Sequence, residues 1–264
     1  MNWHNIDKQR DPLQYGKFLA SANGMSRILN YKRRIESMLG LEPGMQVLDL
    51  GCGTGQDAAA IADLVGTDGR VVAADNSLAM LNLARQTCRD RSNVEFAHTD
   101  AYNLPFADQT FDRTRTDRVL QHLRQPELVI AEMVRVTKVG GLVCCADPDW
   151  RTLVIDSADA DLEASVCRAV QARIQNAGMG ARLKRLLAEQ RLTNIQLEGY
   201  TLIFSSFREA DAILILRGAC TTLVEVGKSS PGSVRRWLKD LRLRDRNGQF
   251  FASLSGFCAV GVRQ

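Results

Sequence analysis

The chain has 264 residues, a length that suits one large domain or one domain with a sizeable insertion. Hydrophobic residues make up 45% and charged residues 24%, which is typical of a soluble globular protein. No segment approaches the roughly 18 consecutive apolar residues of a membrane helix, and much of the net charge of +4 comes from one arginine-rich segment, residues 235–246.

That segment fits either an anionic partner or, more simply, the solvated face of an amphipathic helix. No basic stripe interleaved with aromatic residues indicates a nucleic acid partner. The first residues, MNWHNIDKQRDPLQYGKF, lack the apolar core of a secretory signal. The seven cysteines have no paired spacing, and Cys144 and Cys145 sit in a strand-like run. We therefore expect reduced thiols, no metal site and a cytoplasmic protein. A homodimer is one possible assembly.

Residues 1–40 predict a helical and irregular segment that Gly40 and the turn at 42–44 bring to an end. Strands and helices then alternate, which predicts a parallel sheet with right-handed crossovers. The expected strands are 45–50, 71–75, 93–100, a strand from 110 that runs into a short helix by 123, and 140–149. The expected helices are 56–65, 77–89 and 126–138.

The second half of the chain is less regular. It predicts helix over most of 156–191 with a break at 178–180, a strand at 194–204, two helices divided by the turn at 229–232, and a last strand at 248–263. We therefore expect an α/β fold with a doubly wound, mostly parallel sheet. A helical lid segment would cover 1–40, and the domain at 41–264 would carry helical insertions at about 151–192 and 205–245.

The stretch VLDLGCGTGQDAAAIA, residues 47–62, places three glycines where the first strand gives way to a helix. Gly51, Gly53 and Gly55 let the chain turn sharply and approach a ligand without Cβ clashes. In an open α/β sheet this junction is the ligand crevice. A dinucleotide loop would place its third glycine at position 56, where this chain has Gln56. A tight turn without a ligand is the structural alternative.

Acids end the next two expected strands. Asp75 can accept hydrogen bonds from both hydroxyls of a ribose, and it could equally cap the helix that follows. Beside an adenine, Asp100 would accept from the exocyclic amine while the Ala101 N–H donates to the ring; a surface turn is the alternative. Together the two acids suit an adenosine-bearing cofactor.

These residues resemble a known family. The segments VLDLGCGTG, DAYNLPFADQTFD and EMVRVTKVGG, with the acid at Asp75, are similar to the motifs of class I S-adenosylmethionine-dependent methyltransferases. The menaquinone/ubiquinone-type branch and its small-molecule relatives are the most similar. The resemblance covers residues 40–150 and implies S-adenosylmethionine as cofactor, bound by a Rossmann-like sheet of seven strands whose last strand is antiparallel.

The resemblance also implies roles for single residues at the cofactor. Asp49 would orient the loop, and the strand end at Asp117 and Arg118 would face the methionine part. The other implied contacts are Gly51, Cys52, Gly53 and Gly55 against the methionine and sugar, Asp75 on the ribose, Asn76 and Met80 beside the adenine, and Asp100 with Ala101 at its edge. Residues 113–118, RTRTDR, are more charged than the apolar strand usual there, which leaves the path of the fourth strand open.

Methyl transfer from a sulfonium is an in-line displacement that needs alignment and, for a weak nucleophile, a base. His122 follows the fourth strand and is the first candidate; a packing role for it fits equally well. Asp147 and Asp149 flank Pro148 at the end of the fifth strand, where they could accept a proton, orient His122, attract a cationic acceptor or simply form the turn. Trp150 would wall an acceptor pocket or belong to the core.

Tyr15, Phe18 and residues 200–230 are candidate lid elements, which would exclude water from the reaction. We therefore predict an S-adenosylmethionine-dependent methyltransferase acting on oxygen, nitrogen or carbon of a small-molecule acceptor, in secondary metabolism or quinone-like biosynthesis. Two alternatives stay open. One is an NAD(P)-dependent Rossmann oxidoreductase, which would share Asp75. The other is a protein of the same fold that binds S-adenosylmethionine without transferring its methyl group.

Overall fold

The computed structural model describes residues 3–9, 11–13, 15–16, 19 and 26–264, so Phe18 lies outside the described residues. The chain forms one mixed sheet in the order β3-β2-β1-β4-β5-β8-β6, and β7 pairs with β8 off this path. The strands are β1 (Gln46–Leu50), β2 (Arg70–Asp75), β3 (Val94–His98), β4 (Phe111–Asp117), β5 (Thr137–Pro148), β6 (Val154–Ile155), β7 (Thr193–Phe204) and β8 (Ala252–Val262).

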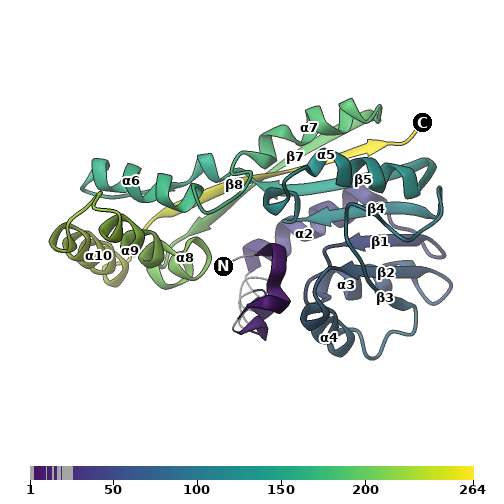
Figure 1. Cartoon of the computed structure of the whole chain (residues 1–264), viewed down its shortest axis with the longest axis horizontal. Helices are drawn as coiled ribbons and strands as arrows, with labels where there is room; N and C mark the ends of the chain where they lie inside the picture. Colours follow the sequence, from purple (N-terminus) through teal and green to yellow (C-terminus); the bar gives the residue numbers. More distant parts are fainter. Residues whose placement is uncertain (1–2, 10, 14, 17–18, 20–25) are drawn as a thin grey trace.

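Helices cover both faces of the parallel half of the sheet (Figure 1). Val47 of β1 packs with α3 and α4, whereas its neighbour Leu48 belongs to the cluster built with α5 and α7. This two-sided burial explains the continuous apolar run of β1. The described helices are η1 (Trp3–Lys8), α2 (Ser26–Leu39), α3 (Gln56–Val65), α4 (Leu78–Thr87), η2 (Leu120–His122), α5 (Pro126–Val136), η3 (Trp150–Thr152), α6 (Ala160–Gln171), α7 (Met179–Glu189), α8 (Phe207–Leu214), α9 (Leu216–Glu225) and α10 (Pro231–Arg246).

The charged segment RTRTDR lies within a central strand. β4 pairs in parallel with β1 on one side and with β5 on the other. This resolves the path of the fourth strand, which the sequence left open. β5 begins at Thr137 rather than at residue 140, because Thr137 already pairs with Phe111 before a register shift in the ladder.

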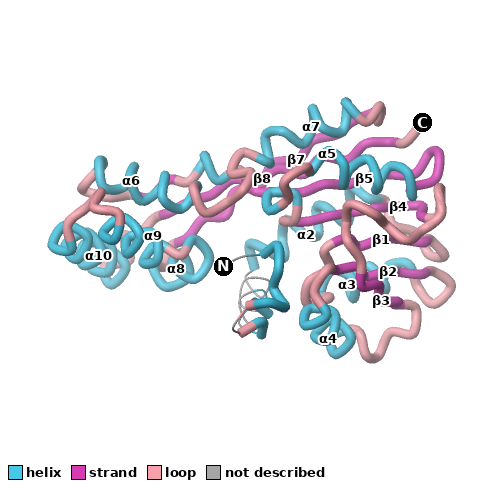
Figure 2. Tube along the Cα trace, in the orientation of Figure 1, coloured by secondary structure: helices cyan, strands magenta, loops and turns pink. Residues whose placement is uncertain are grey.

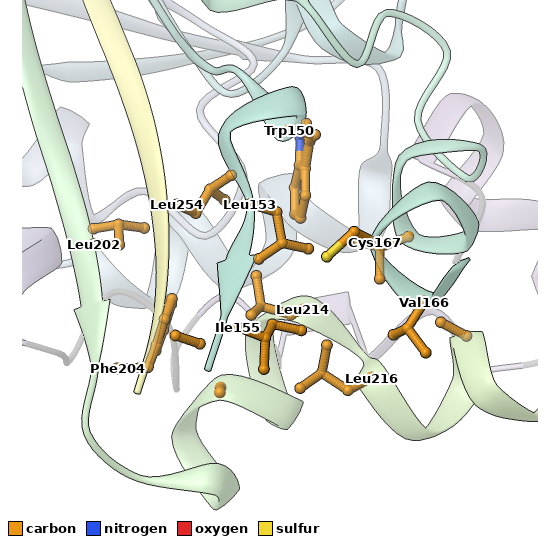
Figure 3. Close-up of a cluster of buried hydrophobic side chains, with 14 of the residues drawn as sticks. Trp150, Leu153, Ile155, Val166, Cys167, Leu202, Phe204, Leu214, Leu216 and Leu254 are labelled. Carbon is orange, nitrogen blue, oxygen red and sulfur yellow. The ribbon is translucent and has the colours of Figure 1, made fainter. Parts of the chain in front are cut away.

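β7 and β8 form a long antiparallel pair that continues beyond the parallel half, and α6, α8, α9 and α10 gather at its far end (Figures 1 and 2). A core of buried apolar side chains, including Trp150, Leu153 and Phe204, joins these helices to the strands (Figure 3). Three helices follow β7 rather than the predicted two, because the chain also turns at Ile215.

The predicted fold class is confirmed, and the last long strand, β8, runs antiparallel to β5. The sheet has eight strands rather than seven because β6, of two residues, adds to β8. α10 carries the arginine-rich segment as an amphipathic helix that buries Val234, Trp237 and Leu241. No helix in the described part of the chain is both long and apolar enough to cross a lipid bilayer.

Candidate functional site

A cavity of about 630 Å³ lies where β1, β2 and β4 end at their carboxyl edge, and it reaches the α8–α9 corner. Ligand pockets of drug-sized molecules have volumes of about 300–1,000 Å³. Parallel α/β sheets bind ligands at this edge because the strand ends leave a crevice there.

The glycine loop forms one wall of the cavity, with Gly51 and Gly53 in its lining. Gly51 has a φ of 74°, and a Cβ atom there would lie 2.3 Å from Cγ2 of Val119. Gly55 serves helix packing instead. It has a φ of 81°, and its Cβ would lie 2.9 Å from the Ala84 backbone, so it lets α3 and α4 approach each other. The loop therefore needs glycine for close approach at two separate places.

Asp75 holds this loop in place. Its Oδ2 accepts a hydrogen bond from the Gly53 N–H at 2.9 Å, and its Oδ1 accepts from the Ser77 N–H at 2.9 Å. The carboxylate lines the cavity although only 8% of the residue is exposed. Burial raises the pKa of Asp75, and the backbone donors oppose that rise. The cap predicted as an alternative role is thus present, with Asp75 accepting from Ser77 and the Ser77 hydroxyl accepting from the Met80 N–H.

Asn76, Met80, Asp100 and Ala101 line the end of the cavity beyond Asp75. Asp100 is exposed, and its Oδ1 accepts from the Tyr102 N–H at 3.0 Å. On the other side, Ile6 and Tyr15 of the N-terminal segment pack against Met80. His98 also lines this end, with its Nε2 3.2 Å from the Asn76 carbonyl oxygen.

Asp7 attaches the N-terminal segment to this part of the site. Its carboxylate accepts from the Ser77 hydroxyl at 2.5 Å and from the Leu78 N–H at 2.8 Å, at the start of α4. Negative charge is stabilised at a helix N-terminus. Burial opposes ionisation of Asp7, but these donors win and lower its pKa.

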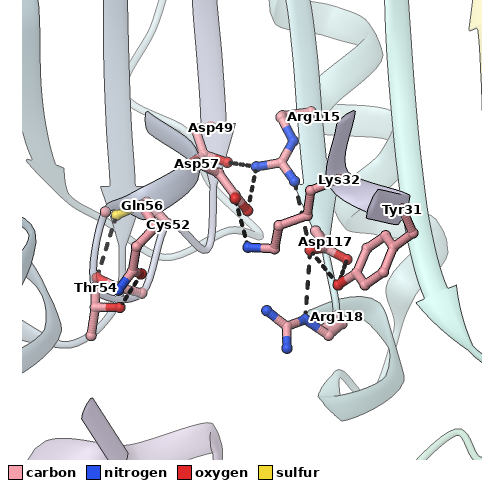
Figure 4. Close-up of polar contacts among 12 residues, drawn as sticks. Tyr31, Lys32, Asp49, Cys52, Thr54, Gln56, Asp57, Arg115, Asp117 and Arg118 are labelled. Carbon is pink, nitrogen blue, oxygen red and sulfur yellow. Dashed lines mark hydrogen bonds and ion pairs between the residues drawn. The ribbon is translucent and has the colours of Figure 1, made fainter. Parts of the chain in front are cut away.

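A network of buried and partly buried charges lies beside the glycine loop (Figure 4). Arg115 of β4 contacts Asp49 at 2.6 Å and Asp57 at 3.1 Å. Lys32 of α2 contacts Asp57 at 2.6 Å. The Arg115 guanidinium also lies 3.7 Å from Asp117. Arg115 therefore joins β1, α3 and the end of β4, which is why a charged side chain is retained in a central strand.

The acids of this network have shifted pKa values. Burial raises the pKa of Asp49 to about 6, although Arg115 opposes the rise. Burial also opposes ionisation of Asp57, but Lys32 and Arg115 outweigh it and hold its pKa well below the usual value. Asp57 is thus the ionised partner that both cations share.

Asp117 and Arg118 lie where β4 ends, and both line the cavity. The Tyr31 hydroxyl donates to Oδ2 of Asp117 at 3.1 Å, and Nε of Arg118 lies 3.5 Å from the same oxygen. The Tyr31 ring stacks on Tyr200 of β7 with centroids 4.1 Å apart. α2 and β7, far apart in the sequence, therefore meet at the cavity beside Asp117.

Of the three candidate catalytic residues, His122 lines the cavity, whereas Asp147 and Asp149 are not in its lining. Asp147 is fully buried, and its Oδ1 accepts from the Gln121 N–H at 3.4 Å at the start of η2. Burial, with Asp117 nearby, raises the pKa of Asp147 well above its usual value. Asp149 is paired with Arg151 at 2.6 Å and caps η3.

The part of the cavity lining that comes from Pro148 onward in the chain, here called the uncharged end, has no charged side chain. Trp150 lines it and donates from Nε1 to Oε1 of Gln121 at 2.5 Å, so this residue serves the cavity wall and the core together. The remaining lining residues of this end come from the insertions and from the β7–β8 pair, and they are Ile174, Tyr200, Leu202, Ile213, Ile215 and Leu254.

Comparison with protein families matches residues 41–193 to the methyltransferase domain. The match spans more than half of the chain. The chain belongs to the methyltransferase domain family. This confirms the resemblance seen in the sequence and, with it, S-adenosylmethionine as the cofactor of the family.

Two relatives show how far the sequence similarity of this methyltransferase domain protein extends. An uncharacterised 37.1 kDa protein from a transposon of Streptomyces fradiae is 33% identical over 232 residues, 88% of this chain and 66% of that protein. The demethylmenaquinone methyltransferase of Staphylococcus aureus is 34% identical over 125 residues, 47% of this chain and 52% of the enzyme. The alignments thus span about half to two thirds of these curated relatives.

The fold is also similar to phosphoethanolamine N-methyltransferase 2 of Haemonchus contortus, solved with phosphomonomethylethanolamine and S-adenosylhomocysteine. The TM-score is 0.61 with 16% identity, covering all of this chain and 60% of that chain. At this identity the likeness concerns the fold alone.

The site of this methyltransferase domain protein includes residues that the sequence analysis did not single out. Tyr31, Lys32 and Tyr200 lie outside the family motifs, in segments that the sequence marks only as candidate lid elements, and nothing local distinguishes these single residues. Arg115 and Asp57 had a signal, the unusual charge of residues 113–118 and the acid at the start of α3. Pairing them required the register of β1 and β4.

Proposed function

We propose that this chain is an S-adenosylmethionine-dependent methyltransferase that modifies oxygen, nitrogen or carbon of a small organic acceptor. The observation that carries the proposal is one continuous cavity. It runs from the glycine loop and Asp75, past the strand end at Asp117, to an uncharged and mainly apolar chamber. A cofactor site and an acceptor site sharing one cavity is what direct transfer between two bound molecules requires.

The cradle at the loop suits the adenosyl part of the cofactor. Gly51 and Gly53 present bare backbone to the cavity. Both oxygens of Asp75 accept backbone N–H groups, and a carboxylate has about four acceptor sites, so acceptor capacity is left for the ribose. We assign Asn76 and Met80 to the flanks of the adenine, and Asp100 with Ala101 to its edge, as the family resemblance implies.

The network of buried charges beside the glycine loop suits the amino acid part of S-adenosylmethionine. Three acids, Asp49, Asp57 and Asp117, face three cations, Lys32, Arg115 and Arg118. A zwitterionic group adds one charge of each sign and leaves that balance unchanged. We assign Arg118 and Lys32 to the carboxylate and Asp117 to the ammonium group, because these three side chains line the cavity.

When bound, S-adenosylmethionine supplies a methyl group on a positively charged sulfur. The protein has to align the acceptor with it, exclude water and, for a weak nucleophile, take up a proton. We assign proton removal to His122, because it lines the cavity on η2. Asp147 at the start of η2 and Asp149 at the start of η3 would then position His122 and Trp150 without contacting the substrate.

The N-terminal segment, residues 1–40, would act as a lid over the cofactor. Ile6 and Tyr15 close the adenine end, and Asp7 attaches them to α4. A lid of this kind excludes water from the reaction. The seven cysteines are free and buried, which supports a cytoplasmic enzyme, and relatives named demethylmenaquinone methyltransferase support a quinone-like acceptor or a related metabolite.

Calorimetry with S-adenosylhomocysteine and NADH tests the cofactor. The wild type should bind S-adenosylhomocysteine and not NADH. Gly53→Arg should lose this binding, because the new side chain enters the cradle, whereas Gly227→Arg should retain it, because Gly227 has a similar positive φ and no atom within 4 Å. Binding of NADH instead would favour the oxidoreductase.

Transfer of a labelled methyl group tests the reaction itself. His122→Ala should slow turnover without weakening cofactor binding, and unaltered turnover would remove His122 from the mechanism. If S-adenosylhomocysteine binds but no acceptor is labelled across phenols, amines and quinols, the non-methylating alternative is favoured.

A further inference from the structure

The corner between α8 and α9 contains an unusual backbone conformation. Ile215 has a φ of 54° and a ψ of 49°, in the left-handed region. The other non-glycine residues with positive φ in the described part of the chain are Gln109, Arg118, Arg191 and Asn194, none of them β-branched. A β-branched residue in this region is a genuine outlier, and such strain persists only where the surrounding structure imposes it.

The surroundings do impose it. The Asp211 side chain accepts from the Arg217 N–H at 2.8 Å and from Arg217 Nε at 2.5 Å, which ties the end of α8 to the start of α9. Leu214 and Leu216, on either side of Ile215, are buried in the helical core (Figure 3). Because both neighbours are anchored, the residue between them has to make the whole turn.

Glycine or asparagine would make this turn with less strain. The side chain of Ile215 therefore needs an explanation of its own, and its position supplies one. Ile215 is half-buried and lines the uncharged end of the cavity together with Ile213, Leu202 and Leu254. No charged side chain lies among the residues that line this end.

We propose that Ile215 is a specificity-determining residue whose strained corner holds its branched side chain as the end wall of the acceptor chamber. The acceptor class that fits is an uncharged molecule with an apolar tail, and the wall limits the length of that tail. The inference rests on the proposed function, since it treats the uncharged end of the cavity as the acceptor chamber.

Calorimetric binding of 4-alkylphenols, from methyl to octyl, to protein saturated with S-adenosylhomocysteine tests this wall. Each methylene that becomes buried should raise the affinity about fourfold, until the tail reaches the wall and the gain stops. In Ile215→Gly the gain should continue for several further methylenes, because the side chain is gone. In Ile215→Val, which keeps the β-branch and the fold, it should continue for about one more.

Arg191→Gly is the matched control, because Arg191 also has a positive φ, of 60°, but is exposed and lies outside the cavity lining. In Arg191→Gly, the longest alkyl chain that still gains affinity should be the same as in the wild type. An unchanged limit in both Ile215 variants, or an equal change in Arg191→Gly, overturns the role of Ile215. If S-adenosylhomocysteine binds but no alkylphenol does, the acceptor class is wrong and the cofactor assignment survives. If S-adenosylhomocysteine itself does not bind, it is the proposed function that fails.

Discussion

The contact between Gly51 and Val119 allows a quantitative test of the glycine loop. In Gly51→Ala, the left-handed backbone with a φ of 74° costs about 1–2 kcal/mol for a residue with a Cβ atom. The new Cβ would also lie 2.3 Å from Cγ2 of Val119, more than an ångström inside ordinary contact. Overpacking of this kind costs about 1–3 kcal/mol. We therefore expect Gly51→Ala to lower the free energy of unfolding by about 2–5 kcal/mol.

Gly227→Ala separates the two contributions, because Gly227 has a φ of 70° and no atom within 4 Å of an added Cβ. Urea unfolding should show a loss of only about 1–2 kcal/mol for this control. Adding Val119→Ala to Gly51→Ala should recover most of the difference, since neighbouring residues couple in a double-mutant cycle. Equal losses in Gly51→Ala and Gly227→Ala, or additivity in the cycle, would refute the contact as the reason for glycine at position 51.

Three further predictions concern ionisable residues. Arg115→Met should lower the free energy of unfolding by about 3–5 kcal/mol, because it leaves buried acids without their partner. Arg91→Met, at an exposed ion pair, should lower it by less than about 1 kcal/mol. Similar urea midpoints for the two variants would contradict this prediction. Burial and Asp117 raise the pKa of Asp147, so the stability that its neutral form contributes is complete below about pH 4 and is lost as pH rises toward the folded-state pKa. The stability of Asp147→Asn relative to wild type should therefore increase as pH rises above about 4, and a difference independent of pH would argue against a neutral carboxyl. Asp7→Ala should weaken S-adenosylhomocysteine binding in calorimetry, because it detaches the N-terminal segment from α4. Asp159→Ala is the control: it removes a comparable cap from α6, outside the cavity lining, and should leave binding intact. Equal effects of the two substitutions would speak against a lid.

The parallel half of the fold could be read from the sequence because its signals are local. The apolar run at 45–50 predicts a strand buried on both faces, and the structure has β1 there. The positions of Gly51, Asp75 and Asp100 at strand ends also follow, since parallel strands bring their carboxyl ends to one edge. The cofactor half of the site was therefore predictable once the strands were placed.

The acceptor half was not predictable in the same way. Tyr31 and Tyr200 are 169 positions apart in the sequence and stack only because α2 packs against β7. Asp147 and Asp149 look alike in the segment DPDW, but one is buried beneath η2 and the other is paired with Arg151. The environment of Asp147 depends on η2, 26 positions earlier in the chain, so spacing alone could not distinguish the two acids.

The sequence by itself determined the strand and helix alternation, the bare loop after β1 and the acids that follow the next two strands. These features depend on local backbone preference and on the period of the apolar residues. Only the tertiary structure decided that Arg115 would be a buried partner of two acids and that Ile215 would line the cavity. Both outcomes depend on contacts between segments distant in the sequence, where packing outweighs the preference of the single residue.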